Sequence, residues 1–225
     1  MSAVSGVKKV AIIVFPGTNC ENDIVLGLRR VGVESEKVWH KQGDLSDFDA
    51  VVIPGGFAFG DYLRPGAIAR FSPIMSEVLR LAAKGAPVLG ICNGFQVLTE
   101  AGLLPGALQK NAGLSFICKT VDLEVVSSAS NLTSAVVVGE RLRVPINHFE
   151  GNFTASEEVI EELEGTKRVV LRYLDNPNGS MNSIAGITNA AGNVVGLMPH
   201  PERASDSLRG ETDGLKLLHG FAHSL

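Results

Sequence analysis

Pro87-Val88-Leu89-Gly90-Ile91-Cys92-Asn93-Gly94-Phe95-Gln96 combines an apolar run, a sharp turn and the start of a helix within ten residues. Pro87–Leu89 predicts a short buried strand, and Phe95–Leu103 predicts a helix. Cys92 lies on the turn between them, with one glycine two residues before it and another two residues after it. This is the spacing of a G-x-nucleophile-x-G elbow with sulfur in place of oxygen. Crowding at such a turn leaves room only for glycine at the flanking positions, and the helix N-terminus favours the thiolate.

The composition is that of an ordinary globular protein, with 225 residues of which 45% are hydrophobic and 20% charged. We expect a single domain over residues 1–225, because α/β chains of this length often form one core. The net charge of −4 and the scattered positions of the basic residues argue against a nucleic-acid partner. Val10–Phe15 is too short to span a bilayer, and no cleavage site follows it. Three widely spaced cysteines favour free thiols in a reducing cytoplasm.

Strands and helices alternate in the first half of the chain. Apolar runs closed by proline or glycine predict strands at Val7–Phe15, Val33–Trp39 and Ala50–Ile53, followed by the strand before Cys92. Helices are expected at Thr18–Arg30, which opens on the capping-box pattern Thr-Asn-Cys-Glu, and at Ala67–Lys84. This order predicts an α/β fold whose sheet is mostly parallel and carries helices on both faces.

The second half contains closely spaced strand-like runs and few helices. The expected strands are Leu114–Thr120, Val121–Ser127, Ser134–Val138, Arg141–Ile146, Val169–Leu174, Ile184–Thr188 and Asn193–Met198. A polar helix is expected at Ser156–Glu164 and a closing helix at Ser207–His223. We interpret this half as antiparallel hairpins that are appended to the first sheet or extend it.

His200 is the best candidate for the acid or base that a cysteine nucleophile needs. It lies just past an expected strand, where functional groups collect in open α/β sheets. Pro201 disfavours helical geometry at His200, and side chains two apart in an extended segment point the same way. Glu202 is therefore placed to orient the imidazole, which predicts a Cys–His–Glu triad.

An oxyanion produced at Cys92 needs backbone donors. The N–H of Asn93, directly after the nucleophile, is one candidate. Gly55 and Gly56 follow the expected strand Ala50–Ile53, and their bare backbone can approach the same point closely. We expect the Gly56 N–H to be the second donor and the loop at Gly55 to contact the substrate.

The elbow together with His-Pro-Glu at 200–202 resembles the class I (triad) glutamine amidotransferases. Longer strings, over essentially the whole chain from Val7, are similar to those of the glutaminase subunits of phosphoribosylformylglycinamidine synthases. These strings are Pro16–Cys20, Ile53–Arg64, Gly102–Ala107, His148–Phe153 and Met198–Ala204. The resemblance implies a flavodoxin-like sheet with an antiparallel extension. It implies that Cys92 is the nucleophile of glutamine hydrolysis, His200 its acid and base, and Glu202 the orienting residue.

The resemblance also implies how substrate and partners are bound. Gln96 matches a position that holds the amino-acid end of glutamine, and Asn147 and His148 match the opposite wall of that pocket. No G-x-x-x-x-G-K-[ST] phosphate loop is present, so we expect no cofactor or metal on this chain. ATP and Mg²⁺ would be used by a large synthetase subunit, accompanied by a third small subunit, to convert formylglycinamide ribonucleotide to its amidine. Phe57, Phe59, Tyr62 and Leu63 are the expected docking residues.

Other interpretations of the same residues remain open. The chain is alternatively another cysteine hydrolase of this architecture, such as an intracellular peptidase or a γ-glutamyl hydrolase, or a catalytically silent regulatory subunit. Cys20, in the first turn of an expected helix, is a rival reactive thiol, whereas Cys118 is expected in the core. His219 and His223 are four residues apart on the last helix but have no evident third metal ligand.

Overall fold

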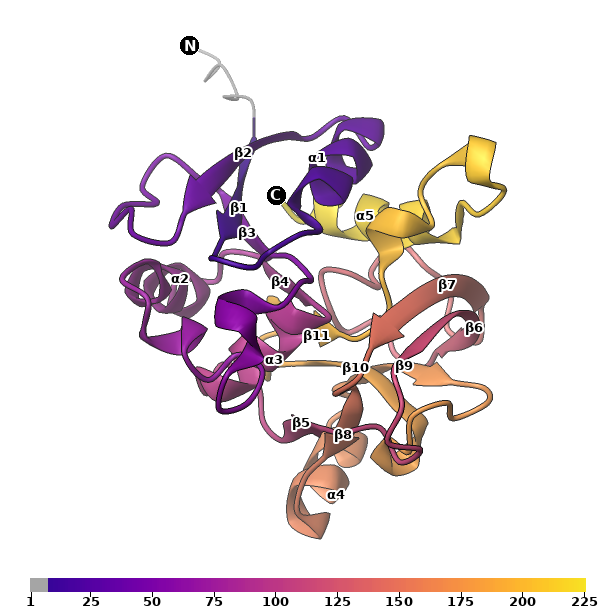
Figure 1. The fold of residues 1–225 in the computed structure, drawn as a ribbon. Helices are drawn as coiled ribbons and strands as arrows, with labels where there is room; N and C mark the ends of the chain where they lie inside the picture. Colours follow the sequence, from indigo (N-terminus) through magenta and orange to yellow (C-terminus); the bar gives the residue numbers. More distant parts are fainter. Residues whose placement is uncertain (1–7) are drawn as a thin grey trace.

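A computed structural model describes residues 8–225, so Val7 and the rest of the first seven residues of the expected domain lie outside the described part. The main sheet has nine strands in the order β2-β1-β3-β4-β11-β10-β9-β6-β7 (Figure 1). They are β1 (Lys9–Val14), β2 (Glu34–Trp39), β3 (Ala50–Ile53), β4 (Val88–Ile91), β6 (Ile117–Val125), β7 (Arg141–His148), β9 (Val169–Tyr173), β10 (Ile184–Thr188) and β11 (Val194–Leu197). The strands from β2 to β11 in this order pair in parallel, and those from β11 to β7 pair antiparallel. The predicted fold class is confirmed.

Five α-helices accompany the sheet. They are α1 (Glu21–Arg30), α2 (Ile74–Ala83), α3 (Asn93–Glu100), α4 (Glu157–Gly165) and α5 (Asp213–His223). Figure 1 shows α1 and α5 on one side of β1, β3 and β4, with α2 and α3 on the other. Every residue of β3, β4 and β11 is buried, as continuous apolar runs covered on both faces require. No helix in residues 8–225 is both long and apolar enough to cross a membrane.

Two expected helices of the first half begin later than predicted. Thr18 does not cap α1; its hydroxyl instead accepts a hydrogen bond from the Phe15 N–H at 3.0 Å, and the helix starts at Glu21. The helix expected at Ala67–Lys84 is interrupted by extended backbone at Ser72. Pro73 follows, and the residue before a proline avoids helical geometry, so α2 begins only at Ile74.

The predicted strands of the second half need three corrections. Leu114–Thr120 and Val121–Ser127 merge into one continuous strand, β6, because no turn separates them, and residues 114–116 and 126–127 lie outside this strand. Ser134–Val138 is wrong as a strand: it forms turns, with the Val136 N–H donating to the Thr133 carbonyl at 3.1 Å. The short antiparallel pair of β5 (Ala107–Gln109) and β8 (Asn152–Thr154) is not predicted, since three residues carry too little periodicity.

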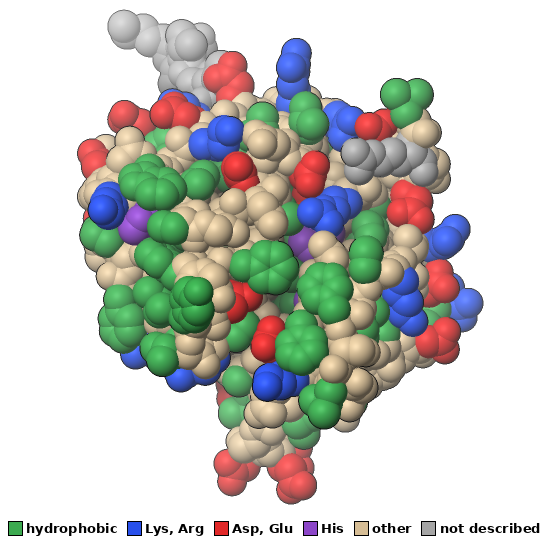
Figure 2. Space-filling view, in the orientation of Figure 1, with side chains coloured by type: hydrophobic (Ala, Val, Ile, Leu, Met, Phe, Trp, Pro, Cys, Tyr) green, Lys and Arg blue, Asp and Glu red, His purple; other side chains and the backbone are tan. Residues whose placement is uncertain are grey.

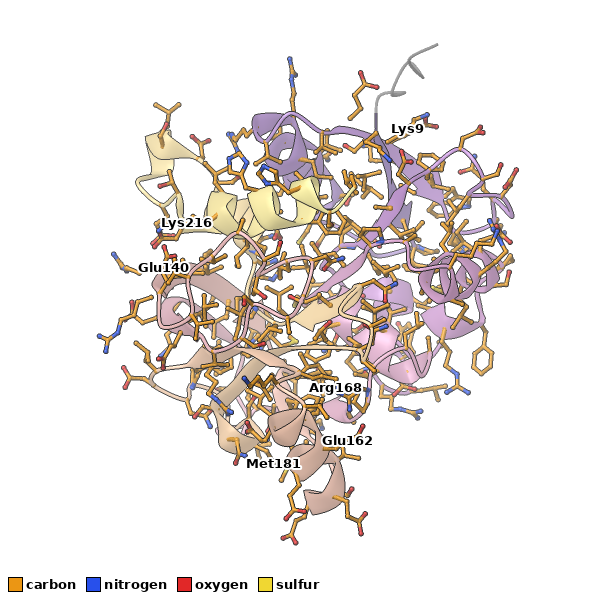
Figure 3. The ribbon with its side chains drawn as sticks, turned by 180° about the vertical axis from the view of Figure 1, so that it is seen from behind. Lys9, Glu140, Glu162, Arg168, Met181 and Lys216 are labelled. Atoms are coloured by element: carbon orange, nitrogen blue, oxygen red, sulfur yellow. The ribbon has the colours of Figure 1, made fainter. Side chains whose placement is uncertain are left out.

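The closing helix is shorter than expected. A 3-10 turn at Ser207–Arg209 ends at Gly210, which adopts the left-handed φ of 78°, and α5 follows from Asp213. From behind, Figure 3 shows Lys216 of α5 beside Glu140, which directly precedes β7. Their Nζ and Oε1 atoms are 2.8 Å apart. This exposed ion pair joins the last helix to the antiparallel half.

Candidate active site

The elbow at Cys92 is built as the sequence predicts. β4 ends at Ile91, α3 begins at Asn93, and Cys92 between them has φ 52° and ψ −106°, a strained backbone for a residue with a side chain. A Cβ atom added at Gly94 would lie 1.9 Å from the Ile53 carbonyl oxygen, and one at Gly90 would lie 2.5 Å from a methyl group of Leu98. The expectation that only glycine fits at both flanking positions is confirmed.

The sheet brings His200 to the elbow from far along the chain. β11 pairs in parallel with β4, so that Leu197 lies beside Ile91, and the Cys92 N–H donates to the Leu197 carbonyl at 2.8 Å. His200 follows β11 by three residues, at the carboxyl edge where parallel strands of an open sheet converge. Its own N–H donates to the Pro145 carbonyl of β7 at 2.8 Å. Two neighbouring strand ends and one antiparallel strand thus position the imidazole.

His200 and Glu202 form a buried pair. Nδ1 of His200 and Oε1 of Glu202 are 2.6 Å apart, and the side chains are 1% and 0% exposed. Burial disfavours the charged imidazole, but the Glu202 carboxylate and the sulfur of Cys92 more than offset burial and raise the pKa of His200 above its ordinary value. The ring is therefore held protonated beside Cys92, which is itself buried.

Two backbone N–H groups are free to face an oxyanion. Gly56 lies opposite Thr18 in a short antiparallel contact between two loops. The hydrogen bonds of this contact run from the Phe57 N–H to the Gly17 carbonyl at 2.9 Å and from the Asn19 N–H to the Gly55 carbonyl at 3.4 Å. In this antiparallel pattern the N–H of Gly56 points away from Thr18. The Asn93 N–H lies in the first turn of α3, where N–H groups have no acceptor within the helix.

The predicted substrate residues surround the same point. A Cβ at Gly55 would come within 2.7 Å of Cε1 of His200 and 3.5 Å of Cβ of Cys92, so Gly55 borders both. The Asn147 carbonyl oxygen lies 3.6 Å from Sγ of Cys92. The Gln96 side chain accepts a hydrogen bond from Nδ2 of Asn93 at 2.8 Å and donates one to a backbone carbonyl of the opposite wall.

His148 is buried behind this wall, and its protonation differs from that of His200. Its Nδ1 lies 3.0 Å from Oδ1 of Asn111, whose own amide nitrogen donates to two carbonyl groups. Oδ1 must then accept, which puts the His148 proton on Nδ1. Burial and the charge of His200 lower the pKa of His148 to about 4. The ring is therefore neutral near pH 7.

The structure separates the two other cysteines, since Cys20 lies at the site and Cys118 does not. Cys20 is expected only as a rival thiol, yet its sulfur accepts a hydrogen bond from Nη2 of Arg203 at 3.2 Å and lies beside His200. Cys20 follows β1, whose carboxyl end shares the sheet edge with β3 and β4, and this topology is the signal that would have found it. Cys118, expected in the core, is exposed on β6 and lies outside the site.

Apolar side chains gather in the middle of the face shown in Figure 2, with acidic and basic side chains between them. Among the expected docking residues, Phe57, Tyr62 and Leu63 are exposed. Phe59 is an exception, because it is partly buried and its ring packs edge-on against His40 at 5.2 Å.

The chain is similar to known proteins over nearly its whole length. A family model described as the CobB/CobQ-like glutamine amidotransferase domain matches residues 7–213. The phosphoribosylformylglycinamidine synthase subunit PurQ of Trichormus variabilis is 55% identical over 215 residues, which cover 95% of this chain and 96% of that protein. Subunit PurQ of Rubrobacter xylanophilus is 53% identical over 210 residues, covering 93% and 96%. The structure of PurLQS from Thermotoga maritima matches with a TM-score of 0.89 at 42% identity, covering 96% of this chain and 98% of that chain.

Proposed function

The chain belongs to the family of CobB/CobQ-like glutamine amidotransferase domains, and we propose that it is the glutaminase subunit of phosphoribosylformylglycinamidine synthase. In this role it hydrolyses L-glutamine to glutamate and ammonia. The observation that carries the proposal is the position of Cys92 on a strained elbow beside the buried His200–Glu202 pair, whose bonded atoms are 2.6 Å apart. Relatives that are 55% and 53% identical in sequence over nearly the whole chain support the assignment.

The first half of the reaction is acyl transfer to sulfur. The thiolate of Cys92 attacks the carboxamide carbon of glutamine, a C–S bond forms, and the carbonyl electron pair moves onto oxygen. The N–H groups of Gly56 and Asn93 stabilise this oxyanion. The protonated His200 then donates its proton to the departing nitrogen, the C–N bond breaks, and ammonia leaves a glutamyl thioester.

The second half returns the enzyme to its starting state. Neutral His200 accepts a proton from water as the water oxygen attacks the thioester carbon. The same two N–H groups stabilise the second oxyanion, which collapses as the C–S bond breaks. Glutamate is released, and Cys92 and His200 are left as thiolate and imidazolium. Glu202 keeps Nδ1 of the ring engaged throughout, so that the other nitrogen faces the reacting atoms.

Substrate binding is proposed for the residues around this point. Gly55 offers bare backbone next to His200 and Cys92, and Asn147 presents its carbonyl to the sulfur. The Gln96 side chain is hydrogen-bonded to both α3 and the opposite wall, and this fixed amide supports its proposed role in holding the amino-acid end of glutamine. His148, neutral and buried, supports that wall.

The acceptor of ammonia lies on a partner in this proposal. We infer that a large synthetase subunit uses ATP and Mg²⁺ to convert formylglycinamide ribonucleotide to the amidine, with a third small subunit in the same cytoplasmic complex. The Thermotoga maritima structure is named PurLQS, and this name joins the letter Q of PurQ to two further letters, L and S. The name supports an assembly of this kind. The exposed side chains of Phe57, Tyr62 and Leu63 lie on the segment that follows Gly56, which suits a partner that stimulates the glutaminase on docking.

Covalent labelling tests the assignment. The protein is incubated with a diazo-ketone analogue of glutamine, with and without the synthetase subunit, and the adduct is mapped by mass spectrometry. We expect the label on Cys92, its loss in Cys92→Ala, and its retention in the exposed-thiol control Cys118→Ala. A label confined to Cys20, or none with the partner present, would contradict the proposal and favour a different hydrolase or a silent subunit.

A further inference from the structure

The side chain of Asn93 is buried directly after the nucleophile, and both polar atoms of its amide are hydrogen-bonded. The residue is 2% exposed. Its Oδ1 accepts from the Ala58 N–H at 3.0 Å, and its Nδ2 donates to Oδ1 of Asp61 at 3.1 Å and to Oε1 of Gln96 at 2.8 Å. The reaction proposed above uses only the backbone N–H of Asn93 and assigns no role to this amide.

The first two of these hydrogen bonds end in residues 57–63, the loop that follows Gly56. Three residues of this loop have side chains and still adopt a left-handed φ, of 56°, 54° and 70° at Phe59, Asp61 and Leu63. Side chains disfavour this backbone region, and such strain persists only where surrounding contacts fix it. The Asn93 amide is one such contact, and it fixes the loop from the side of the elbow.

The third hydrogen bond sets which way the Gln96 amide faces. Nδ2 of Asn93 can only donate, so the Gln96 atom that meets it must be the oxygen. The Gln96 nitrogen is then left for the Glu150 carbonyl, to which it donates at 2.5 Å. One buried amide therefore joins three parts of the site: the loop after β3, the start of α3 and, through Gln96, the opposite wall.

We propose that the side chain of Asn93 is a positioning group for glutamine hydrolysis. It holds residues 57–63 against the elbow, so that the N–H groups of Gly56 and Asn93 face one point, and it fixes the orientation of the Gln96 amide. The two donors come from different segments, and they stabilise one oxyanion only while those segments keep their relative position. A displacement of about 1 Å can cost about 10²-fold in rate. This inference rests on the proposed function.

Substitutions at Asn93 and Asp61 separate the two sides of the amide, with ammonia release measured over a range of glutamine concentrations in the presence of the synthetase subunit. Asn93→Leu removes all three hydrogen bonds at similar size. We expect kcat to fall about 10²-fold and KM to rise about fivefold, the effect of one hydrogen bond at Gln96. Asp61→Leu removes only one bond to the loop, so kcat should fall less, about tenfold, with KM unchanged. Asp61→Asn keeps an oxygen that accepts from Asn93, and it should restore kcat.

Asn193 is the matched control, a buried asparagine at the opposite end of β11 from His200. Its Nδ2 donates to two backbone carbonyls, each at 2.9 Å, and its Oδ1 accepts from another side-chain amide at 2.9 Å. Asn193→Leu therefore removes as many hydrogen bonds as Asn93→Leu does. It should lower stability in urea unfolding and leave kcat and KM unchanged. If Asn93→Leu does not fold, Asn93→Ala takes its place beside Asp61→Leu.

Amide hydrogen exchange tests the same link without substrate. In Asn93→Leu the exchange of residues 57–63 should be at least about fivefold faster than in wild type, whereas Asn193→Leu should leave it unchanged. The proposal is overturned if exchange is the same in the two variants, or if Asn93→Leu leaves the kcat of an active enzyme unchanged. It is also overturned if Asp61→Asn and Asp61→Leu raise KM alike, because the carboxylate would then contact substrate. Faster exchange in Asn93→Leu, in a protein that hydrolyses no glutamine even with its partner, would refute the proposed function alone.

Discussion

The parallel and antiparallel halves of the sheet serve the site in different ways. Each of four parallel strands ends next to a group of the site: Cys20 after β1, Gly56 after β3, Cys92 after β4 and His200 after β11. The antiparallel half contributes through β7, and there mainly through backbone carbonyls. Parallel strands all end at one edge, so their short turns converge, whereas an antiparallel strand passes the site and presents its side to it. In the proposed reaction, the reacting groups therefore come from the parallel half of the sheet and the supporting contacts from the antiparallel half.

Removal of the nucleophile should have the largest effect. In Cys92→Ala we expect glutamine hydrolysis to fall at least about 10⁴-fold, because the remaining groups stabilise an oxyanion that no longer forms. Ammonia release is measured per folded protein, with circular dichroism as the control for structure. Activity within about tenfold of wild type would show that the parallel half does not supply the chemistry in this way.

Substitution of Gly56, the proposed oxyanion donor after β3, should have the second largest effect. In Gly56→Ala we expect kcat to fall about 10²- to 10³-fold, the usual loss for one oxyanion donor. Gly56 has a φ of 149°, and a Cβ there would lie 2.8 Å from the Asn19 nitrogen, so the turn must shift.

Gly43→Ala is the matched control for this substitution, since no atom lies within 4 Å of a Cβ at Gly43. It should leave kcat unchanged. Equal rates in the two variants would remove Gly56 from the oxyanion site.

His148, at the end of β7 in the antiparallel half, should make the free energy of unfolding depend on pH in the acid range. Burial and the charge of His200 lower the pKa of His148 to about 4, below its ordinary 6.5. The unfolded state therefore binds this proton first, and stability is lost as the pH falls from about 6.5 to about 4, by about 3 kcal/mol. Urea unfolding of wild type and His148→Gln across this range tests it. The variant should lack this part of the loss; parallel curves for the two proteins would contradict the buried neutral ring.

The smallest effect is expected at Asp61, beside the elbow. Burial and then the charge of Glu150 raise the pKa of Asp61 to about 6. The folded state binds this proton more tightly, so stability falls as the pH rises from about 4 to about 6. Asp61 is half-buried, and solvent screening limits the change to about 1 kcal/mol. Asp61→Asn still accepts from Asn93. In urea unfolding it should remove this fall, and an unchanged slope would count against the raised pKa.

Predictions from sequence succeeded where a short stretch carries its own cause. The elbow was recognised because glycine spacing and a strand-to-helix change are local, and the buried strands because continuous apolar runs admit few alternatives. They failed where distant packing competes with local pattern. Ser134–Val138 is as apolar as a strand, but no neighbouring strand within residues 8–225 pairs with it. Thr18 has the spacing of a cap, but its hydroxyl bonds to Phe15.

Local chemistry along the chain thus settled the nature of the nucleophile, the glycines beside it and the alternation that makes a parallel sheet, because steric crowding and hydrophobic period act over a few residues. Only the tertiary structure decided that a second sulfur, that of Cys20, lies beside His200 in addition to the sulfur of Cys92. It also settled why two buried histidines carry different protonation. Those properties depend on burial and on charges from segments that meet only in the folded sheet. Glu202 and the two cysteines raise the pKa of His200. Burial and the charge of His200 lower the pKa of His148.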